Sequence, residues 1–273
     1  MRFTKLHGLG NDFIILNAFR QAPEAPDVLA RRLCRRHFGI GADGLILALP
    51  SDRADARMRI LNRDGSEAEM CGNGLRCLGK FLYDTGLCRR TALRVETLAG
   101  ILDLTMTTGG DGTVSTVTAD MGAPRFDPPS IPVSADSNAI TLEAGGHRLR
   151  FFCVSMGNPH AVTFDLFPED ETFAALGPLL ECHPIFPRHC NIEFCRLEDE
   201  GVRVRVWERG DGPTLACGTG ACAVLAAGAC QQLLPRQSDV RLPGGTLTIR
   251  WDGGGHLFMT GPAETVFTGE IVL

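Results

Sequence analysis

The stretch CGNGLRCLGK at residues 71–80 decides how this chain is interpreted, because its first four residues, the tetrad CGNG, occur a second time in similar form. At residues 217–226 the chain reads CGTGACAVLA, again a cysteine, a glycine, a polar residue and a glycine ahead of an apolar run. The two leading cysteines, Cys71 and Cys217, are 146 positions apart. A repeat with so long a period predicts two halves that share one topology.

Two further matches at nearly the same offset support a duplicated chain. The pair Gly-Asn at residues 10–11 returns at residues 157–158, and each copy lies beside an apolar run. TLAGIL at residues 97–102 resembles LPGGTL at residues 242–247, which brings Gly100 and Gly245 into correspondence at an offset of 145. Three independent matches indicate that each half repeats the same order of elements.

Each half is expected to form strands, then one helix, then more strands. Residues 95–107 and 202–207 alternate in the manner of half-buried strands. Residues 75–83 and 221–232 are the best helix candidates, and the second is apolar on nearly every face. Such a helix is buried, so we expect it to run through the middle of its half. The proline-rich segment 123–129 is the expected crossing between the halves.

Composition narrows the function classes. The 273 residues carry 27 basic and 32 acidic side chains with no basic run, which argues against a nucleic-acid partner. No stretch of 18 apolar residues and no apolar signal core at the N-terminus is found, so we expect a cytoplasmic protein without a membrane partner. The eleven cysteines include no CxxC pair, and we expect most of them to be reduced.

No metal site is expected from the cysteines and histidines. The closest groupings are Cys34 with His37, and residues 182–183 with residues 189–190. Neither has the ligand spacing of a structural zinc site. The cysteines outside the two tetrads are therefore interpreted as packing residues: Cys34, Cys77, Cys88, Cys153, Cys182, Cys190, Cys195, Cys222 and Cys230.

A cysteine at the start of a helix has a specific chemistry. The first backbone N–H groups of a helix have no partner within it, and the positive end of the helix dipole lies there. This environment binds a carboxylate and lowers the pKa of a thiol from about 8.5 towards neutrality. Two such thiols that faced one carbon from opposite sides could invert a stereocentre by removing and returning a proton. No nucleotide-binding motif is present, and no cofactor is expected.

At this point the chain resembles the diaminopimelate epimerase family. Residues 62–74 (NRDGSEAEMCGNG) and 208–221 (ERGDGPTLACGTGA) are similar to its two signature segments. Residues 8–13 (GLGNDF), 39–44 (GIGADG) and 156–160 (MGNPH) match in the same order. The resemblance implies cofactor-independent conversion of LL-2,6-diaminoheptanedioate to the meso isomer, a step toward lysine and peptidoglycan precursors, and commonly a homodimer.

The resemblance also implies a fold of the α/β class (α+β type), with two pseudo-symmetric domains, each a mostly antiparallel sheet wrapped around a central helix. The expected halves are residues 1–118 plus 263–273, which carry Cys71, and residues 119–262, which carry Cys217. Some members of the family carry a glutamine where this chain has Gly44, so a side-chain contact there is lost or replaced by backbone.

Site roles follow from the same resemblance. Cys71 and Cys217 match the acid–base pair, with His160 and Glu208 beside the reacting centre. A substrate with two ammonium and two carboxylate groups calls for neutral amides, an arginine and a carboxylate. The backbone N–H groups expected to bind carboxylate are those of Gly72, Asn73, Gly218 and Thr219, and the side chains expected to hold substrate are Asn11, Asn62, Asn158, Asn191 and Arg209.

Three alternatives remain at this stage. A relative with the same cysteine pair could act on proline, hydroxyproline or histidine, although proline-type racemases tend to have histidine where this chain has Asn73. A thiol redox or metal-binding protein would carry CxxC or ligand spacing. A non-catalytic binding module would have no reason to keep both Cys71 and Cys217.

Overall fold

The computed structural model describes residues 1–253 and 255–272, which fold as two compact units. The first unit contains Met1–Asp120 and Thr260–Leu273, and the second contains Met121–Met259. Gly254 and Leu273, one position from each expected half, lie outside the described residues. The chain thus passes between the units just after Asp120 and again at Met259, so the expected crossing at residues 123–129 lies inside the second unit.

The elements of each unit follow the same order. In the first unit they are β1 (Arg2–Gly8), β2 (Asn11–Asn17), α1 (Pro26–Leu33), β3 (Gly44–Leu49), β4 (Ala56–Asn62), β5 (Glu67–Ala68), α2 (Gly72–Asp84), β6 (Ala92–Thr97), β7 (Gly100–Thr108), β8 (Val114–Asp120) and the returning β18 (Glu264–Glu270). In the second they are the short 3-10 helix η1 (Pro128–Ser130), β9 (Ala139–Ala144), β10 (His147–Ser155), β11 (Pro159–Thr163), α3 (Asp170–Glu181), β12 (Asn191–Glu198), β13 (Gly201–Glu208), β14 (Gly212–Pro213), α4 (Gly218–Cys230), β15 (Gln237–Leu242) and β16 (Gly245–Trp251). Strand β17 (Leu257–Pro262) leads back to the first unit.

The strand registers repeat between the units. In the first unit β2 runs parallel to β3 with Phe13 opposite Gly44, and in the second β11 runs parallel to β12 with His160 opposite Asn191, both 147 positions later. The antiparallel hairpins β6–β7 and β15–β16 close on Gly100 and Gly245, which are 145 positions apart. The repeat inferred from the cysteine tetrads is therefore a repeat of the hydrogen-bonding pattern itself.

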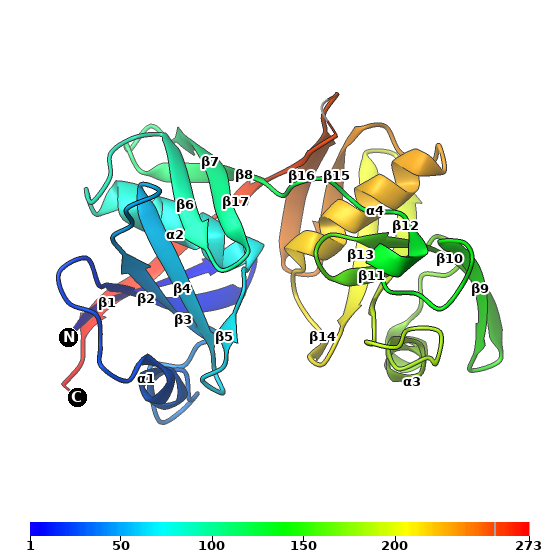
Figure 1. Cartoon of the computed structure of the whole chain (residues 1–273), viewed down its shortest axis with the longest axis horizontal. Helices are drawn as coiled ribbons and strands as arrows, with labels where there is room; N and C mark the ends of the chain where they lie inside the picture. Colours follow the sequence, from blue (N-terminus) through cyan, green and yellow to red (C-terminus); the bar gives the residue numbers. More distant parts are fainter. Residues whose placement is uncertain (254, 273) are drawn as a thin grey trace. The chain divides into compact units, whose positions relative to one another are not determined.

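One helix runs through the strands of each unit (Figure 1). Helix α2 contacts β1, β2, β3, β4, β7 and β8, and helix α4 contacts β10, β11, β12, β15 and β16. Residues 72–82 of α2 are buried, as are residue 218 and residues 220–228 of α4. Among the strand pairs of the described residues whose register is known, four are parallel and the others are antiparallel. The expected fold class, two halves with a mostly antiparallel sheet around a central helix, is confirmed.

Helix α2 contains two basic side chains in its buried face. Arg76 donates to the carbonyl of Pro262 and to the Oδ1 atom of Asn73, at 3.2 and 2.9 Å. Lys80 donates to the carbonyl of Val114 at 2.6 Å. These charges are tolerated because each has polar partners. The bond from Arg76 also connects the start of α2 to the chain segment that returns to this unit.

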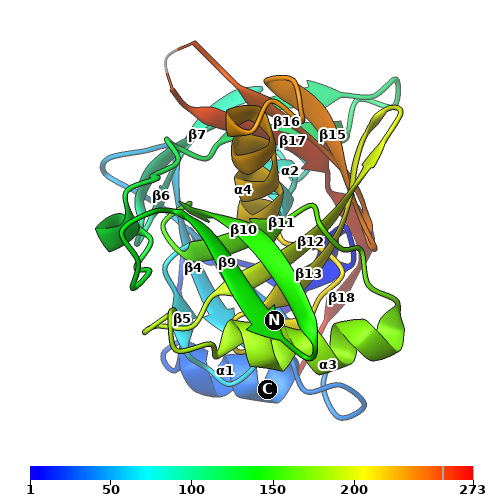
Figure 2. The same ribbon diagram turned by 90° about the vertical axis from the view of Figure 1, so that its right-hand side faces the viewer.

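A second layer covers the outer face of each sheet. In the second unit α3 packs against β9, β12 and β13 (Figure 2), over a core that includes Phe173, Leu176 and Phe194. In the first unit α1 contacts β3 and β4 through buried Leu29 and Leu33. Helices α1 and α3 thus lie on the outside of the two units, whereas α2 and α4 lie on the inside. Cys71 and Cys217 directly precede these two inner helices.

Three local expectations differ from the structure. Residues 95–107 are not one strand: Leu98 and Ala99 form the turn between β6 and β7. Both central helices begin three residues earlier than predicted, at Gly72 and Gly218, because the cysteine before each glycine caps the helix. Helix α4 ends at Cys230 rather than at residue 232, where Gln232 has a positive φ of 60°.

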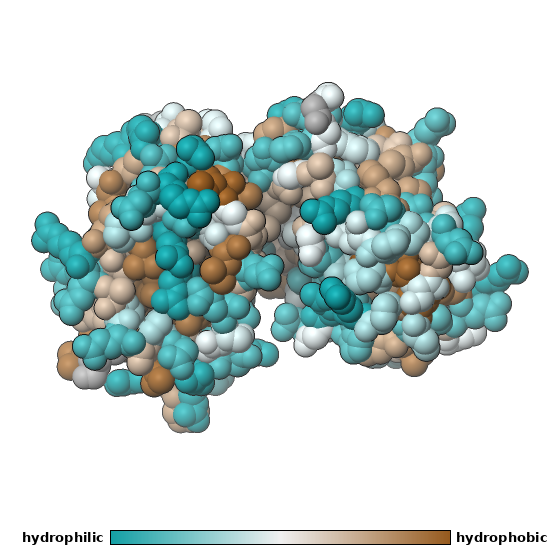
Figure 3. All heavy atoms as spheres, viewed as in Figure 1, coloured by the Kyte–Doolittle hydropathy of each residue, from teal (hydrophilic) through white to brown (hydrophobic). Residues whose placement is uncertain are grey.

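Apolar side chains are dispersed on the face of the molecule that Figure 3 draws. On the face shown in Figure 3 they form small spots among polar side chains on each unit. Among the described residues, no helix is both long enough and apolar enough to span a bilayer. Most of the apolar residues are instead in the cores around the helices.

Candidate active site

Both tetrad cysteines are the N-cap residues of the central helices. Cys71 and Cys217 have extended backbone conformations, and each sulfur accepts a hydrogen bond from the backbone amide of the third residue of its helix. The Gly74 amide lies 3.5 Å from the Cys71 sulfur, and the Gly220 amide lies 3.4 Å from the Cys217 sulfur. Each sulfur therefore lies at the positive end of a helix dipole, next to first-turn N–H groups of the kind that bind anions.

In the first unit, the side chains around Cys71 form an amide network. The Asn11 Oδ1 atom lies 3.7 Å from the Cys71 sulfur and accepts a hydrogen bond from Asn73 at 3.1 Å. The other end of the Asn11 amide donates to Asp43 at 2.9 Å. Three predicted site residues, Cys71, Asn11 and Asn73, are thus brought together at one helix start.

In the second unit, the corresponding network surrounds Cys217. Thr219 takes the place of Asn73, with its hydroxyl 3.6 Å from the Cys217 sulfur. The Asn158 side chain donates to the same hydroxyl at 3.3 Å, and its Oδ1 atom lies 3.0 Å from Nε2 of His160. The predicted residues Cys217, Thr219, Asn158 and His160 therefore form one connected group.

His160 is paired with a carboxylate that the sequence analysis did not single out. Both His160 and Glu193 are fully buried, and Nδ1 of the imidazole lies 2.6 Å from a Glu193 oxygen. With Asn158 placed as described, Nε2 donates to its Oδ1 atom. The imidazole therefore bridges Asn158 and Glu193. The other oxygen of Glu193 has no hydrogen-bond partner among the described residues.

The two units differ in chemistry at this pair. Counting 147 positions back, His160 corresponds to Phe13 and Glu193 to Ile46, as the matching strand registers require. A methyl group added at Gly74 would lie 3.0 Å from the end of Ile46, and one added at Gly220 would lie 2.9 Å from a Glu193 oxygen. The first turn of α2, which follows Cys71, therefore packs against an apolar side chain. The first turn of α4, which follows Cys217, packs against the histidine–glutamate pair.

The electrostatics at Cys217 correct one sequence-based expectation. Burial raises the pKa of the Cys217 thiol well above its ordinary value, and the nearby carboxylates of Glu208 and Glu193 raise it further. Hydrogen bonds from Thr219 and Gly220 act in the opposite direction but are outweighed. The expectation of a lowered pKa is therefore wrong for Cys217, because desolvation and two negative neighbours exceed the effect of the helix dipole.

Glu208 lies at the end of β13, half-buried, in the neighbourhood of Cys217. Its Oε1 atom accepts a hydrogen bond from the Thr214 hydroxyl at 2.6 Å. Burial raises the pKa of this carboxyl group, against the lowering effect of hydrogen bonds from Thr214 and Cys217. Glu208 is therefore a carboxyl group with a raised pKa that lies within hydrogen-bonding reach of the Cys217 thiol.

Asn191 and Arg209 lie together in the second unit. Asn191 is buried, donates to the carbonyl of Pro159 at 2.7 Å and accepts from the Arg209 amide at 2.9 Å. Arg209 is exposed, and its guanidinium donates to the carbonyl of Arg188 at 3.2 Å. Asn191 therefore fixes the backbone that presents the Arg209 side chain.

The last predicted site residue, Asn62, ends β4 in the first unit and is exposed. Its amide donates to the Ser66 hydroxyl at 3.0 Å. Asn62 corresponds to Glu208 of the second unit at an offset of 146. Gly44, the position noted for its departure from the family, corresponds to Asn191 at an offset of 147. A methyl group at Gly44 would lie 2.9 Å from the carbonyl of Leu61.

Sequence reasoning overlooked Glu193, Thr214 and Asp43. Asp43 and Thr214 lie within the motifs quoted above, but neither was assigned a role. Glu193 had a detectable signal, since it is a single charge inside the apolar run IEFC at residues 192–195. A charge in a strand that is buried on both faces requires a buried partner.

Comparison with known proteins relates the whole chain to one family. The family model described as diaminopimelate epimerase matches residues 3–126 and 152–266. A diaminopimelate epimerase of Acetivibrio thermocellus is 49% identical over 282 residues, covering 100% of this chain and 99% of its own. Relatives of the same name from Methanococcus maripaludis and Desulforudis audaxviator are 50% and 51% identical, each covering at least 99% of both chains.

Solved structures with the same fold are more distant in sequence. A probable proline racemase of Agrobacterium radiobacter superposes with a TM-score of 0.75 at 18% identity, covering 100% of this chain and 93% of its own. A hydroxyproline epimerase of Agrobacterium vitis gives 0.73 at 20% identity, covering 99% and 90%. At these identities the likeness establishes the fold alone.

Proposed function

Because the chain belongs to the diaminopimelate epimerase family, we propose that it converts LL-2,6-diaminoheptanedioate to the meso isomer by proton transfer between two cysteines. The observation that carries this proposal is the register-matched pair of N-capping thiols, Cys71 and Cys217. Relatives of about 50% identity over the full length favour this substrate over proline or hydroxyproline, which appear only in the names of neighbours at 18–20% identity.

The proposed step balances without an external oxidant or reductant. A thiolate removes the α-proton and becomes a thiol, which leaves a carbanion at the α-carbon. The opposite thiol then gives its proton to the other face and becomes a thiolate. Because burial and two carboxylates hold the proton on Cys217 in the resting protein, we assign Cys217 as the proton donor of that state and Cys71 as the base.

The neighbouring groups have defined parts in this mechanism. The first-turn N–H groups of α2 and α4 are proposed to bind the α-carboxylate, which stabilises negative charge that develops beside it. Glu208 and the His160–Glu193 pair are proposed to set the proton affinity and position of Cys217. Arg209 is proposed to bind the distal carboxylate with two parallel hydrogen bonds.

We further propose that the enzyme acts in the cytoplasm as a homodimer and needs neither pyridoxal phosphate nor a metal for the reaction. A reducing compartment suits a mechanism that uses two thiols. Dimerisation is proposed on the family resemblance alone, and sedimentation equilibrium would test it. Activity that required added pyridoxal phosphate would contradict the assignment of all acid–base chemistry to side chains.

The direct test is isotopic. Purified protein is incubated with LL-2,6-diaminoheptanedioate in deuterated water, and the products are separated and analysed by mass spectrometry. The proposal predicts meso product with one deuterium at the inverted carbon, since the proton returned comes from a solvent-exchanged thiol. Meso product without deuterium would contradict a two-base mechanism, and an absence of meso product would contradict the substrate.

A further inference from the structure

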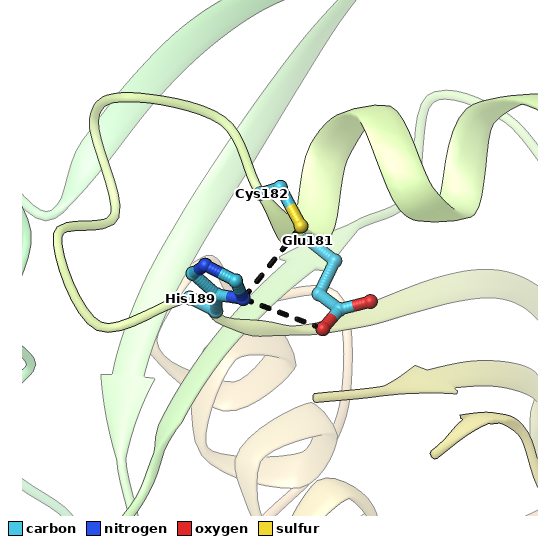
Figure 4. Close-up of side chains that lie close together, drawn as sticks. All are labelled: Glu181, Cys182 and His189. Atoms are coloured by element: carbon cyan, nitrogen blue, oxygen red, sulfur yellow. Dashed lines mark hydrogen bonds and ion pairs between the residues drawn. The ribbon is translucent and has the colours of Figure 1, made fainter. Parts of the chain in front are cut away.

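Three donor atoms converge at the end of helix α3 in the second unit (Figure 4). Glu181 is the last residue of α3, Cys182 follows it, and His189 lies shortly before β12. The Cys182 sulfur and the Glu181 Oε1 atom each lie 3.6 Å from Nδ1 of His189. All three donor atoms lie within 4.8 Å of one another.

This spacing suits a tetrahedral zinc ion. Zinc binds cysteine sulfur at about 2.3 Å and histidine nitrogen or carboxylate oxygen at about 2.0 Å. At tetrahedral angles these bond lengths place sulfur and nitrogen about 3.5 Å apart, and nitrogen and oxygen about 3.3 Å apart. The two observed separations of 3.6 Å are within a few tenths of an ångström of those values.

Hydrogen bonding among the three side chains is weak at these distances. A thiol can donate to Nδ1 of His189 only when that nitrogen carries a lone pair, whereas a carboxylate can accept from it only when it carries a proton. At 3.6 Å from both partners, one proton on Nδ1 can make only a long, shared hydrogen bond to the Cys182 sulfur and the Glu181 oxygen. A cation placed among the three atoms interacts favourably with all of them.

The carboxylate ligand is held in place by other bonds. Glu181 is 8% exposed, and its Oε2 atom accepts from the Trp207 indole at 2.8 Å. Its Oε1 atom accepts from the Gly210 amide, also at 2.8 Å. Such outer contacts orient a metal ligand and reduce the entropy lost on binding. Cys182 and His189 are exposed, so an ion can enter and water can complete its coordination.

We propose that Glu181, Cys182 and His189 bind a divalent zinc ion, with water as the fourth ligand. From the sequence alone, no metal is expected at residues 182–183 and 189–190, because their spacing fits no structural zinc site. The structure places only Cys182 and His189 of these four in the cluster. His183 accepts from the Ile185 amide, and the thiol of buried Cys190 donates to the carbonyl of Asn191. The ligand set includes a carboxylate and spans a loop, which no structural-zinc spacing describes.

The ion would have no part in the proposed proton transfer, but its site adjoins the segment that carries Glu208 and Arg209. Trp207 and Gly210, which bind Glu181, flank Glu208 and Arg209 in the chain. Zinc would therefore connect the end of α3 to the turn that presents both side chains. Trp207, one of two tryptophans in the chain, provides an intrinsic fluorescence reporter of the site.

The test is a metal titration of the full chain after removal of bound metal, in the presence of a phosphine reductant. Cobalt(II) is the probe, because cobalt bound to thiolate gives an intense near-ultraviolet absorption band, and zinc is then used to displace it. We expect one equivalent of cobalt to produce the band, and the same equivalent of zinc to change the tryptophan fluorescence. Cys182→Ser and His189→Ala should each weaken both affinities by more than about tenfold, since even indirect ligand changes cost that much.

Matched variants separate this site from the other thiols. Cys230→Ser and His147→Ala change an exposed cysteine and an exposed histidine of the same unit outside the cluster, and should leave the titration unchanged. Circular dichroism verifies that each variant is folded. A wild-type protein without the cobalt–thiolate band would overturn the proposal. So would a band that persists in Cys182→Ser, or one that disappears in Cys71→Ala or Cys217→Ala.

Discussion

At the scale of single residues, the two cysteine sites are unequal copies. Ile46 packs against Gly74 at the start of α2, whereas Glu193, paired with His160, packs against Gly220 at the start of α4. A buried, hydrogen-bonded charge pair costs desolvation free energy that an apolar pair does not. We infer that the pair persists near Cys217 because it controls the proton on that thiol.

Glu193→Gln tests this role. The change keeps the size of the side chain but removes the carboxylate that holds Nδ1 of His160, so the imidazole loses its fixed orientation. We expect kcat to fall at least about tenfold with little change in KM, as when an orienting carboxylate is removed from a catalytic histidine. Glu143→Gln, at an exposed position of β9 in the same unit, is the control. Unchanged kcat in a folded Glu193→Gln protein would assign the pair a purely structural part.

Arg209→Lys tests recognition of the distal end. A lysine ammonium is a point charge and cannot reproduce two parallel hydrogen bonds to a carboxylate. We expect KM for LL-2,6-diaminoheptanedioate to rise about tenfold or more, while the backbone stays held by Asn191. Steady-state kinetics measure the effect, with alanine and lysine as comparison substrates. Turnover of alanine comparable to that of the natural substrate would indicate a broad amino-acid racemase instead.

At the scale of elements, the starts of α2 and α4 differ in how readily their surroundings can accommodate an added methyl group. An added methyl group at Gly220 would lie 2.9 Å from the Glu193 carboxylate and 3.2 Å from the Cys217 sulfur. At Gly74 the nearest atoms are the terminal methyl groups of Ile46 and Ile60, at 3.0 and 3.2 Å. The methyl ends can move aside, whereas the carboxylate is fixed by His160.

Gly220→Ala should therefore be the more damaging of the two substitutions. We expect it to lower the free energy of unfolding by about 1–3 kcal/mol and to reduce kcat at least tenfold, because overpacking displaces Cys217. Gly74→Ala should retain more of both. Gly110→Ala, where no atom lies within 4 Å of the added methyl, is the control for measurements by denaturant unfolding and steady-state kinetics. Equal losses at Gly74 and Gly220 would contradict the asymmetry.

The sequence predicted these elements well where a pattern repeats. The duplicated tetrads, the apolar run of α4 and the offset glycines led to the two-unit fold. What it could not supply was the hairpin turn at Leu98 and Ala99, because both sides of the turn alternate in the same way. Nor could it supply the pKa of Cys217, since burial and the positions of Glu208 and Glu193 arise only from tertiary packing.

At the scale of the whole molecule, buried thiols connect stability to pH. Burial raises the pKa of Cys34, Cys77 and Cys153 to about 12, and raises that of Cys190, Cys195 and Cys217 well above the ordinary value. In the unfolded chain each thiol titrates near 8.5. The folded protein therefore holds these protons more tightly than the unfolded chain does.

The stability contribution is fully present below about pH 8.5 and is lost as the pH rises toward 12. Each such thiol should cost about 1.4 kcal/mol of unfolding free energy per pH unit in that window. Urea unfolding at pH 7.5 and 9.5 under reducing conditions measures the loss. Cys153→Ala should be less stable at neutral pH. Its free energy of unfolding should, however, fall less steeply with pH, by the contribution of the one thiol that it lacks. Stability that stayed constant up to pH 10 would contradict the raised values.

The central claim is that two thiols, one from each unit, act on a single carbon. Cys71→Ala and Cys217→Ala each remove one proton carrier, and the matched variants Cys77→Ala and Cys222→Ala remove a buried thiol from the interior of each central helix. The measurement is the rate of LL-to-meso conversion by all four folded variants. The account predicts that each of the first two abolishes epimerisation and that the second two stay active with at most a loss of stability. Near-normal conversion by either Cys71→Ala or Cys217→Ala would contradict it.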